Sequence, residues 1–422
     1  MQRFFCILFF LAGFQLNAKN EYPFDFSKSL RIDFYILGDA TTAEVIVSQL
    51  KKEPHWGGSK TNLIFPDFGE LRVRLIDENT GKIVFSKGFN SLFNEWQHVE
   101  QAKTEKKMFL HAIQFPFPTK KLKFSIEKRN KEGRFDDFFQ KTINPDDYFI
   151  KEETVLAYPV KKILENGDAS QKVDLVILAE GYTQNEMAKF YADAKRMTDY
   201  MFTIPPFDAL KQHFNVYAVG VPSQESGTDI PGKNSYKKTA FDASFYTFDM
   251  ERYLTTNNMQ AIADAASLVP YDQIYILVNT ETYGGGGFYN HLNLATSDNK
   301  LSEKVFVHEF GHGFAGLADE YYDSSTAFDS AYNIKVEPWE QNITSLVNFD
   351  TKWKDMIKKT TPIPTPRTSK YEKTVGVFEG GGYVSKGIYS PVQDCRMKSN
   401  DPKGFCPVCQ RAIHKVVKFY TE

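Results

Sequence analysis

Histidine and cysteine are scarce in this chain, so the few places where they occur are informative. The 422 residues include 8 His and 4 Cys, and one of the cysteines, Cys6, lies in an apolar stretch at the N-terminus. So low a cysteine content excludes a small domain held together by many disulfides. The other three cysteines, Cys395, Cys406 and Cys409, are grouped near the C-terminus.

A large net charge, long apolar runs and internal repeats are also absent. With 51 basic and 53 acidic residues the net charge at pH 7 is -2, which argues against a nucleic-acid-binding protein. After the first 18 residues no apolar run approaches the roughly 20 residues that a membrane-spanning helix needs. The chain does have a 15% aromatic content, including 37 Phe, which indicates large buried cores rather than disorder.

The first 18 residues, MQRFFCILFFLAGFQLNA, have the composition of a secretory signal peptide. Arg3 precedes an apolar stretch, and Leu-Asn-Ala precedes the expected cleavage site. No Cys comes directly after that site, so a lipid anchor is not predicted. We therefore expect an exported protein, periplasmic, at the cell surface or secreted, with no transmembrane segment in the mature chain and an oligomeric state that the sequence leaves open.

Two domains are expected after the signal peptide, because one core rarely organises about 400 residues. Residues 19–155 are predicted to form an all-β sandwich domain, since short alternating strands are separated by turn signals such as Asn79-Thr80-Gly81. The expected strands are 30–36, 71–75, 82–85 and 122–126. Trp56 and Trp96 could form a ligand platform, but they are predicted to pack in the core of this domain.

The pattern of apolar residues changes in the second domain, residues 156–422. A continuous apolar strand at 173–179 is followed by a helix that opens with a capping box, Thr183 to Glu186, and runs to about Phe202. Further strands are expected at 214–221 and 273–278. This alternation predicts an α/β core with helices packed on the sheet.

The stretch FVHEFGHGFAGLADEYYD, residues 306–323, contains the pattern His-Glu-x-x-His. On a helix, His308 and His312 lie one turn apart on the same face, as two imidazole ligands of one zinc ion require. Glu309 then lies beside the first ligand, where its carboxylate can take a proton from water. The alternative is a helix with two core histidines bonded to backbone carbonyls. It is disfavoured because burying this cluster without a metal leaves polar groups that need partners.

A catalytic zinc site needs a third protein ligand and an open position. In the metzincin pattern a Gly ends the helix and the ligand follows three residues later, and Gly316 and Asp319 have that relation here. The Gly-x-x-Asp unit lies one residue further along the chain than in the metzincin pattern. The standard spacing would place Ala318 at the ligand position. We therefore predict Asp319 as the third ligand, with Glu320 as its competitor.

Further candidates lie outside the histidine motif. Asp394-Cys395-Arg396-Met397 resembles a Met-turn, in which the Met397 side chain forms an apolar floor beneath the metal ligands. Tyr383 and Tyr389 lie near it in the sequence, and either is a candidate donor to the oxyanion of the transition state. The run Gly284 to Gly287 either borders the cleft or forms a flexible loop.

The three C-terminal cysteines allow two structural interpretations. In an exported protein, a disulfide from Cys395 to Cys406 or Cys409 would connect the predicted Met-turn to the C-terminal helix. The spacing of Cys406-Pro-Val-Cys409 also suits a structural Cys3His zinc site that uses His414.

These stretches together resemble the bacterial IgA peptidase family of metallopeptidases along most of the chain. The resemblance rests on LAEGYT at 178–183, HEFGHGFAGLADEYY, GVFEGGGYVSKGIYSP at 376–391, DCRM at 394–397 and FCPVCQRAI at 405–413. It implies a metzincin-like zinc endopeptidase with Glu309 as general base. It does not imply immunoglobulin A as substrate. Ser390 stands where the family carries Arg, which puts any contact of that Arg with a substrate carboxylate in doubt.

The sequence thus predicts an α/β (α+β), metzincin-like peptidase domain behind a β-sandwich, with one catalytic Zn2+ and a protein or peptide substrate. Two other functions remain open: a surface binding protein with an inactive peptidase domain, and a zinc hydrolase acting on cell-wall peptides. Retention of both histidines and of Glu309 argues against an inactive domain.

Overall fold

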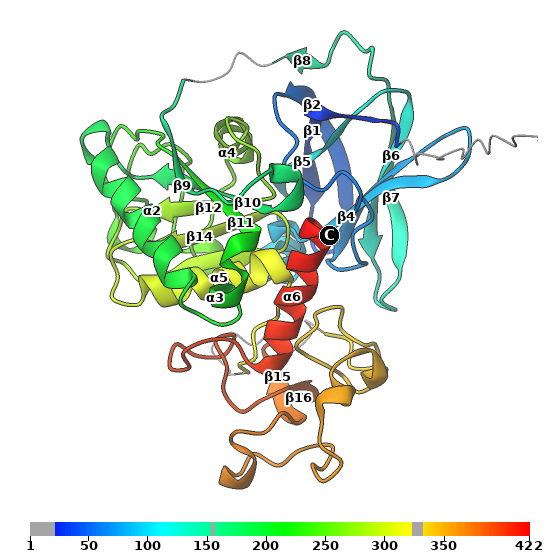
Figure 1. Ribbon diagram of the computed structural model, residues 1–422, viewed down its shortest axis with the longest axis vertical. Coiled ribbons are helices and arrows are strands. Elements are labelled where there is room, and N and C mark those ends of the chain that lie inside the picture. The colour runs from blue at the N-terminus through cyan, green and yellow to red at the C-terminus, as the bar shows by residue number, and fades with distance from the viewer. Residues whose placement is uncertain (1–21, 153–156, 323–331) are drawn as a thin grey trace, which may run out of the picture.

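The computed structural model describes residues 22–152, 157–322 and 332–422. The predicted signal peptide and the predicted domain boundary near residue 155 lie outside the described residues. Figure 1 shows a β-rich part in blue and cyan, an α/β part in green and yellow, and a lower part in orange that the C-terminal helix joins to the others. In the described part of the chain, no helix is long and apolar enough to cross a membrane.

The N-terminal part consists of two four-stranded sheets. One sheet has the order β5 (Lys107–Pro118), β1 (Phe24–Gly38), β2 (Ala43–Glu53) and β8 (Lys151–Glu152); the other has the order β4 (Ile83–Phe89), β3 (Leu71–Ile76), β6 (Leu122–Arg129) and β7 (Phe135–Ile143). The predicted strands 30–36, 71–75 and 122–126 lie within these elements, and the predicted strand 82–85 begins one residue before β4. Apolar side chains from both sheets, such as Phe34 and Phe85, share a core with Trp96, while Trp56 packs at its edge.

The second part is built on a six-stranded mixed sheet. Its order is β13 (Gly285–Phe288), β14 (Leu292–Thr296), β12 (Gln273–Val278), β10 (Val173–Glu180), β11 (Phe214–Val219) and β9 (Val160–Leu164). The helices of this part are α2 (Met187–Met201), α3 (Phe207–Leu210), α4 (Met259–Ala266) and α5 (Ser302–Ala315). The four central strands are parallel and the edge strands β13 and β9 are antiparallel to their neighbours, so the predicted α/β core is present. The predicted capping box is also confirmed: Glu186 accepts a hydrogen bond from the Thr183 backbone N–H at 2.8 Å.

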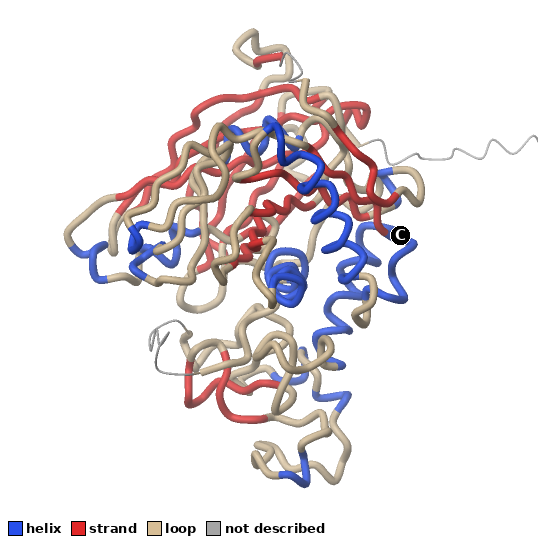
Figure 2. Tube along the Cα trace, turned by 90° about the vertical axis from the view of Figure 1, so that its left-hand side faces the viewer, coloured by secondary structure: helices blue, strands red, loops and turns tan. Residues whose placement is uncertain are grey.

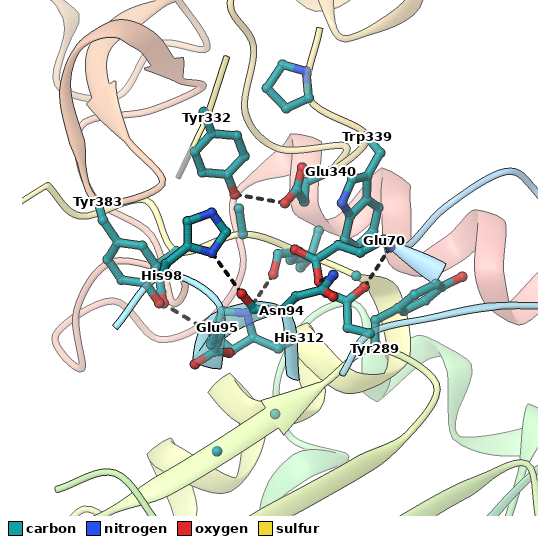
Figure 3. Close-up of a pocket in the computed structure, with 18 of the residues that line it drawn as sticks. Glu70, Asn94, Glu95, His98, Tyr289, His312, Tyr332, Trp339, Glu340 and Tyr383 are labelled. Atoms are coloured by element: carbon teal, nitrogen blue, oxygen red, sulfur yellow. Dashed lines mark hydrogen bonds and ion pairs between the residues drawn. The ribbon is translucent and has the colours of Figure 1, made fainter. Parts of the chain in front are cut away.

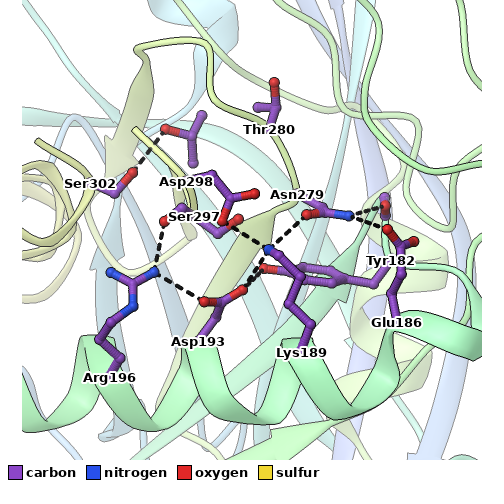
Figure 4. A network of polar contacts seen from close by, with 12 residues as sticks. Tyr182, Glu186, Lys189, Asp193, Arg196, Asn279, Thr280, Ser297, Asp298 and Ser302 are labelled. Carbon is purple, nitrogen blue, oxygen red and sulfur yellow. Dashed lines mark hydrogen bonds and ion pairs between the residues drawn. The ribbon is translucent and has the colours of Figure 1, made fainter. Parts of the chain in front are cut away.

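A polar network fixes the start of α5 against α2 (Figure 4). Lys189 donates to Asp193, to Asn279 at the end of β12 and to Asp298 beyond β14, at 2.8, 2.9 and 2.8 Å. Arg196 bonds the Ser297 carbonyl at 2.8 Å and Asp193 at 3.0 Å. Because these contacts bring together the ends of two strands and the loop that enters α5, they hold that helix in a defined position.

The lower part, residues 332–405, is mostly loop in both views and contains the hairpin β15 (Phe378–Gly381) and β16 (Val384–Ser390) (Figure 2). The C-terminal helix α6 (Pro407–Thr421) runs from it toward the N-terminal sheets, where the Phe419 and Phe65 rings lie 4.2 Å apart.

The β-rich and α/β parts are not packed independently of each other. A single apolar cluster contains side chains of the N-terminal sheets and of the α/β sheet and α4. At the same interface the buried Arg31 guanidinium forms ion pairs with Asp264 of α4 at 2.5 Å and with Glu53 at 2.7 Å. A charge that loses its water must keep its partners, so this contact favours one relative position of the two parts.

A cut close to the junction of the two parts is therefore expected to leave them associated. Tyr148 and Phe149 are 86% and 72% exposed, so limited chymotrypsin should cleave there first. The nicked protein should elute as one particle in gel filtration and separate only on a denaturing gel. A Tyr148→Ser, Phe149→Ser variant should resist the first cut. Fragments that separate under native conditions would contradict a shared core.

Candidate active site

Helix α5 carries the His-Glu-x-x-His motif and ends where the sequence predicted. Gly316 caps it with φ 60° and ψ 37°, the left-handed conformation that Gly adopts without steric cost. On this helix His308 and His312 lie one turn apart, and their Nε2 atoms are 3.1 Å apart. Two zinc-bound nitrogens in tetrahedral geometry would lie roughly 3.3 Å apart, so the pair has the spacing of a chelate.

Backbone carbonyls orient both imidazole rings. His308 Nδ1 lies 2.8 Å from the Arg396 carbonyl, and His312 Nδ1 lies 2.6 Å from the Leu317 carbonyl. A carbonyl can only accept, so each Nδ1 carries the proton and, in the neutral ring, each Nε2 presents a lone pair. Both lone pairs point into the same space.

Asp319 brings a third lone pair to that space. Its Oδ1 lies 3.2 Å from His308 Nε2 and 3.4 Å from His312 Nε2, in a side chain that is 4% exposed. Oδ1 is buried without a hydrogen-bond donor. Three acceptors at these distances, one of them fully buried, require a cation or a proton among them, so the residues fit a divalent metal.

The electrostatics agree with a site made for positive charge. Burial lowers the pKa of His312, but Asp319 and Glu309 raise it, to a net value of about 9. Burial raises the pKa of Asp319, and the two histidines more than reverse this, so that its pKa falls well below its usual range. In each case the charged form is favoured because opposite charge is so near.

Glu309 lies beside the histidines and against the edge strand β13. Ligand atoms of Glu309, His308 and His312 lie within 4.8 Å of one another. Burial raises the pKa of Glu309 and the two histidines counteract it, leaving the pKa raised, as suits a group that takes and returns a proton. A Cβ on Gly285 would lie 2.7 Å from Glu309 Oε1, so this glycine leaves room for the carboxylate.

Tyr383 reaches the site, whereas Tyr389 does not. At the tip of the β15–β16 hairpin, Tyr383 has φ 66°, a strained conformation for a bulky residue, and its hydroxyl donates to Asp319 Oδ2. Tyr389 lies on β16, where its backbone pairs with Thr344, and it does not line the cleft. The strand carries it away from the tip, so the structure brings Tyr383 but not Tyr389 to the site.

Met397 lies directly beneath α5. The Lys398 backbone N–H donates to the Cys395 carbonyl at 2.8 Å and closes a turn that contains Met397. The Met397 side chain is fully buried, and a Cβ on Gly311 would lie 2.7 Å from its sulfur. Gly311 is between the two histidines in the sequence, so Met397 forms an apolar floor at that point of the helix.

The site opens into a cleft of about 1480 Å³ that residues of both parts line (Figure 3). Glu70, Asn94 and Glu95 of the N-terminal part share this cleft with His312 and Tyr383. The sequence predicted no functional residue in the N-terminal part. Its cleft residues reach the site only through the tertiary fold, so no pattern of spacing in the sequence indicates them.

Glu95 is the acidic group of the N-terminal part that interacts with the motif. It accepts a hydrogen bond from Tyr253 at 2.6 Å. Burial raises its pKa, and the Tyr253 hydrogen bond and His312 partly offset the increase, leaving the pKa at about 7. Its charge therefore changes near neutral pH.

The run Gly284 to Gly287 borders the cleft, which was one of two predictions for it; the other was a flexible loop. Three of the four residues lie in β13, the edge strand of the sheet. The outer edge is partly covered, since the Leu254 N–H donates to the Gly285 carbonyl at 3.4 Å. A substrate strand could pair with β13 only beyond this contact.

The disulfide considered from the sequence is not formed. Cys395, Cys406 and Cys409 are buried free thiols, and the sulfurs of Cys395 and Cys409 lie 3.9 Å apart. His414 is exposed on α6 and is not part of the cysteine cluster, so the Cys3His interpretation is also wrong.

Two helix-borne imidazoles, an aspartate and a neighbouring glutamate in one cleft define a candidate metal-dependent hydrolase site. The family model described as IgA Peptidase M64 matches residues 161–372 and 367–417, and the model described as Peptidase M64 N-terminus matches residues 21–140. The chain belongs to the IgA peptidase M64 family, which confirms the resemblance seen in the sequence. The family is one of peptidases and implies a metallopeptidase. A comparison with curated proteins found no match.

Asp319→Ala should weaken metal binding severely, because it removes one of three converging ligand atoms. Competition with a chelator of known affinity measures the change. Glu340→Gln is the matched control: it alters a buried carboxylate of the same cleft whose partner is the Tyr332 hydroxyl at 2.8 Å. An Asp319→Ala protein that holds metal as tightly as the control would exclude Asp319 as a ligand.

Proposed function

We propose that this protein is an exported zinc endopeptidase, with His308, His312 and Asp319 as ligands and Glu309 as general base. The main support is the convergence of three acceptor atoms, 3.1 to 3.4 Å from one another, beside a glutamate. Imidazole and carboxylate donors in this number suit zinc with one position open. The signal-like leader supports export.

When bound, zinc would act as a Lewis acid that lowers the pKa of a water molecule and polarises a peptide carbonyl. Glu309 takes the proton from the attacking water, and its raised pKa suits the later return of that proton to the leaving amine. The Tyr383 hydroxyl, which contacts Asp319 Oδ2, turns toward the substrate and donates to the developing oxyanion.

The cleft supports an endopeptidase rather than an enzyme that acts on peptide termini. Its volume of about 1480 Å³ exceeds the roughly 300–1,000 Å³ of a small-molecule pocket, so a peptide several residues long fits. Its walls come from both parts of the chain, so the N-terminal part contributes to substrate binding.

A metzincin-like architecture for the catalytic part agrees with four features. They are the antiparallel edge strand β13 beside α5, the αL glycine at its end, Asp319 three residues later and the turn at Met397 beneath the helix.

Glu309→Gln should keep stoichiometric zinc and lose about 10²–10⁴-fold in kcat, since it removes the proton acceptor but no ligand. Peptide cleavage measured by mass spectrometry, together with metal analysis of the same sample, checks both statements. A variant that cleaves as fast as the wild type would refute Glu309 as the base and with it the mechanism.

Tyr383→Phe should lower kcat by about 10²-fold with little change in KM, because it removes one hydrogen bond made chiefly in the transition state. Steady-state kinetics with a fluorogenic peptide separate the two constants. Tyr332→Phe is the control, since Tyr332 lines the cleft but bonds Glu340. An equal loss in both variants would point to a general disturbance of the cleft instead.

A further inference from the structure

Behind the catalytic site lies a second cluster of metal-binding side chains. It consists of Cys395, Cys406, Cys409 and Glu320, whose sulfur and carboxylate oxygen atoms all lie within 4.8 Å of one another. All four residues are buried, with exposed fractions of 1%, 6%, 0% and 0%. The proposed peptidase mechanism uses none of them.

The distances in the cluster fit a metal better than a disulfide. The sulfurs of Cys395 and Cys409 are 3.9 Å apart, whereas a disulfide needs about 2.05 Å. Two thiolates on one tetrahedral zinc ion would lie roughly 3.8 Å apart, because each Zn–S bond is about 2.3 Å long. The Cys409 sulfur lies 3.2 Å from Glu320 Oε1, close to the roughly 3.5 Å expected between a sulfur and an oxygen ligand.

Glu320 shows that the cluster lacks positive charge. Its Oε1 is bonded by Asn342 at 3.0 Å and approached by Cys409, but its Oε2 is buried without any hydrogen-bond partner. A fully buried carboxylate with an unpartnered oxygen is costly unless a cation compensates it. The groups in contact with this carboxylate are thiol sulfurs and the Asn342 amide, which carry no positive charge.

The backbone around the cluster favours thiolates. Cys406 is the N-cap of α6 and Cys409 lies in its first turn, where the helix dipole stabilises negative charge. The Cys406 N–H donates to the Cys395 sulfur at 3.2 Å.

We propose that Cys395, Cys406, Cys409 and Glu320 form a second, structural zinc site. Three soft sulfur ligands select Zn²⁺ over Mg²⁺ or Ca²⁺, and four protein ligands close the coordination sphere, as in structural rather than catalytic sites. Glu320 occupies the place that the sequence-based interpretation assigned to His414.

This site holds the catalytic ligands in position. Glu320 directly follows Asp319, and its N–H donates to the Met397 carbonyl at 2.7 Å. Cys395 precedes Arg396, whose carbonyl lies 2.8 Å from His308 Nδ1. One ion bound to Glu320, Cys395 and the start of α6 therefore connects the Asp319 segment, the turn at Met397 and the C-terminal helix.

The test counts zinc in the full chain when the catalytic ligands are absent. The His308→Ala, His312→Ala double variant should purify with about one zinc per chain, and adding Cys406→Ser and Cys409→Ser should remove it. A zinc-free double variant would overturn the proposal. The zinc count does not depend on peptidase activity. The structural site can therefore be disproved while the proposed peptidase function stands, and the peptidase function can be disproved while the structural site stands.

Cobalt gives a readout that needs no cysteine substitution. With Co²⁺ in place of zinc, the double variant should show the intense near-ultraviolet charge-transfer absorption of a thiolate–cobalt site, which the His308–His312–Asp319 site cannot produce. Adding His414→Ala should leave that band unchanged, and adding Glu320→Ala should weaken Co²⁺ binding. The site as proposed would be overturned if the double variant showed no band, or if His414→Ala abolished the band. It would also be overturned if Glu320→Ala left the Co²⁺ affinity unaltered, or if non-reducing mass spectrometry found a disulfide among the three cysteines.

Discussion

The meeting of three acceptor atoms, the Nε2 atoms of His308 and His312 and Oδ1 of Asp319, is the constraint on which the rest of the structure depends. Acceptors without donors repel one another, so the chain must hold them together against that repulsion until a cation joins them. Two carbonyls hold the rings, and Gly316 turns the chain so that Asp319 comes back to the helix. The surrounding elements serve to make this arrangement rigid.

That rigidity comes from both ends of α5. At its start, Lys189 and Arg196 connect α2 to the loops after β12 and β14. Below it, Met397 packs against the helix at Gly311, and the cysteine cluster lies behind the same turn. A ligand shift of a fraction of an ångström is costly in a metal site, so support from several directions is expected.

The N-terminal part is more than an attached module. It shares an apolar core with the α/β part, and its Arg31 is buried in ion pairs that include Asp264. Glu70 and Glu95 line the cleft, so the β-rich part forms one wall of the candidate active site. Removing that part would expose apolar surface, break buried ion pairs and open the cleft at once.

Local patterns determined much of what could be predicted: the strands of both parts, the capping box at Thr183, the end of α5 at Gly316 and the motif from His308 to His312. These depend on neighbours a few residues away, which a sequence displays directly. Only the tertiary structure placed Asp319 beside the two histidines and Glu320, rather than His414, beside the cysteines. It also brought Tyr383 but not Tyr389 to the site, and Glu95 to the cleft. Each of these depends on which distant segments come into contact and on the direction of a side chain after a turn. The spacing of residues in the sequence determines neither.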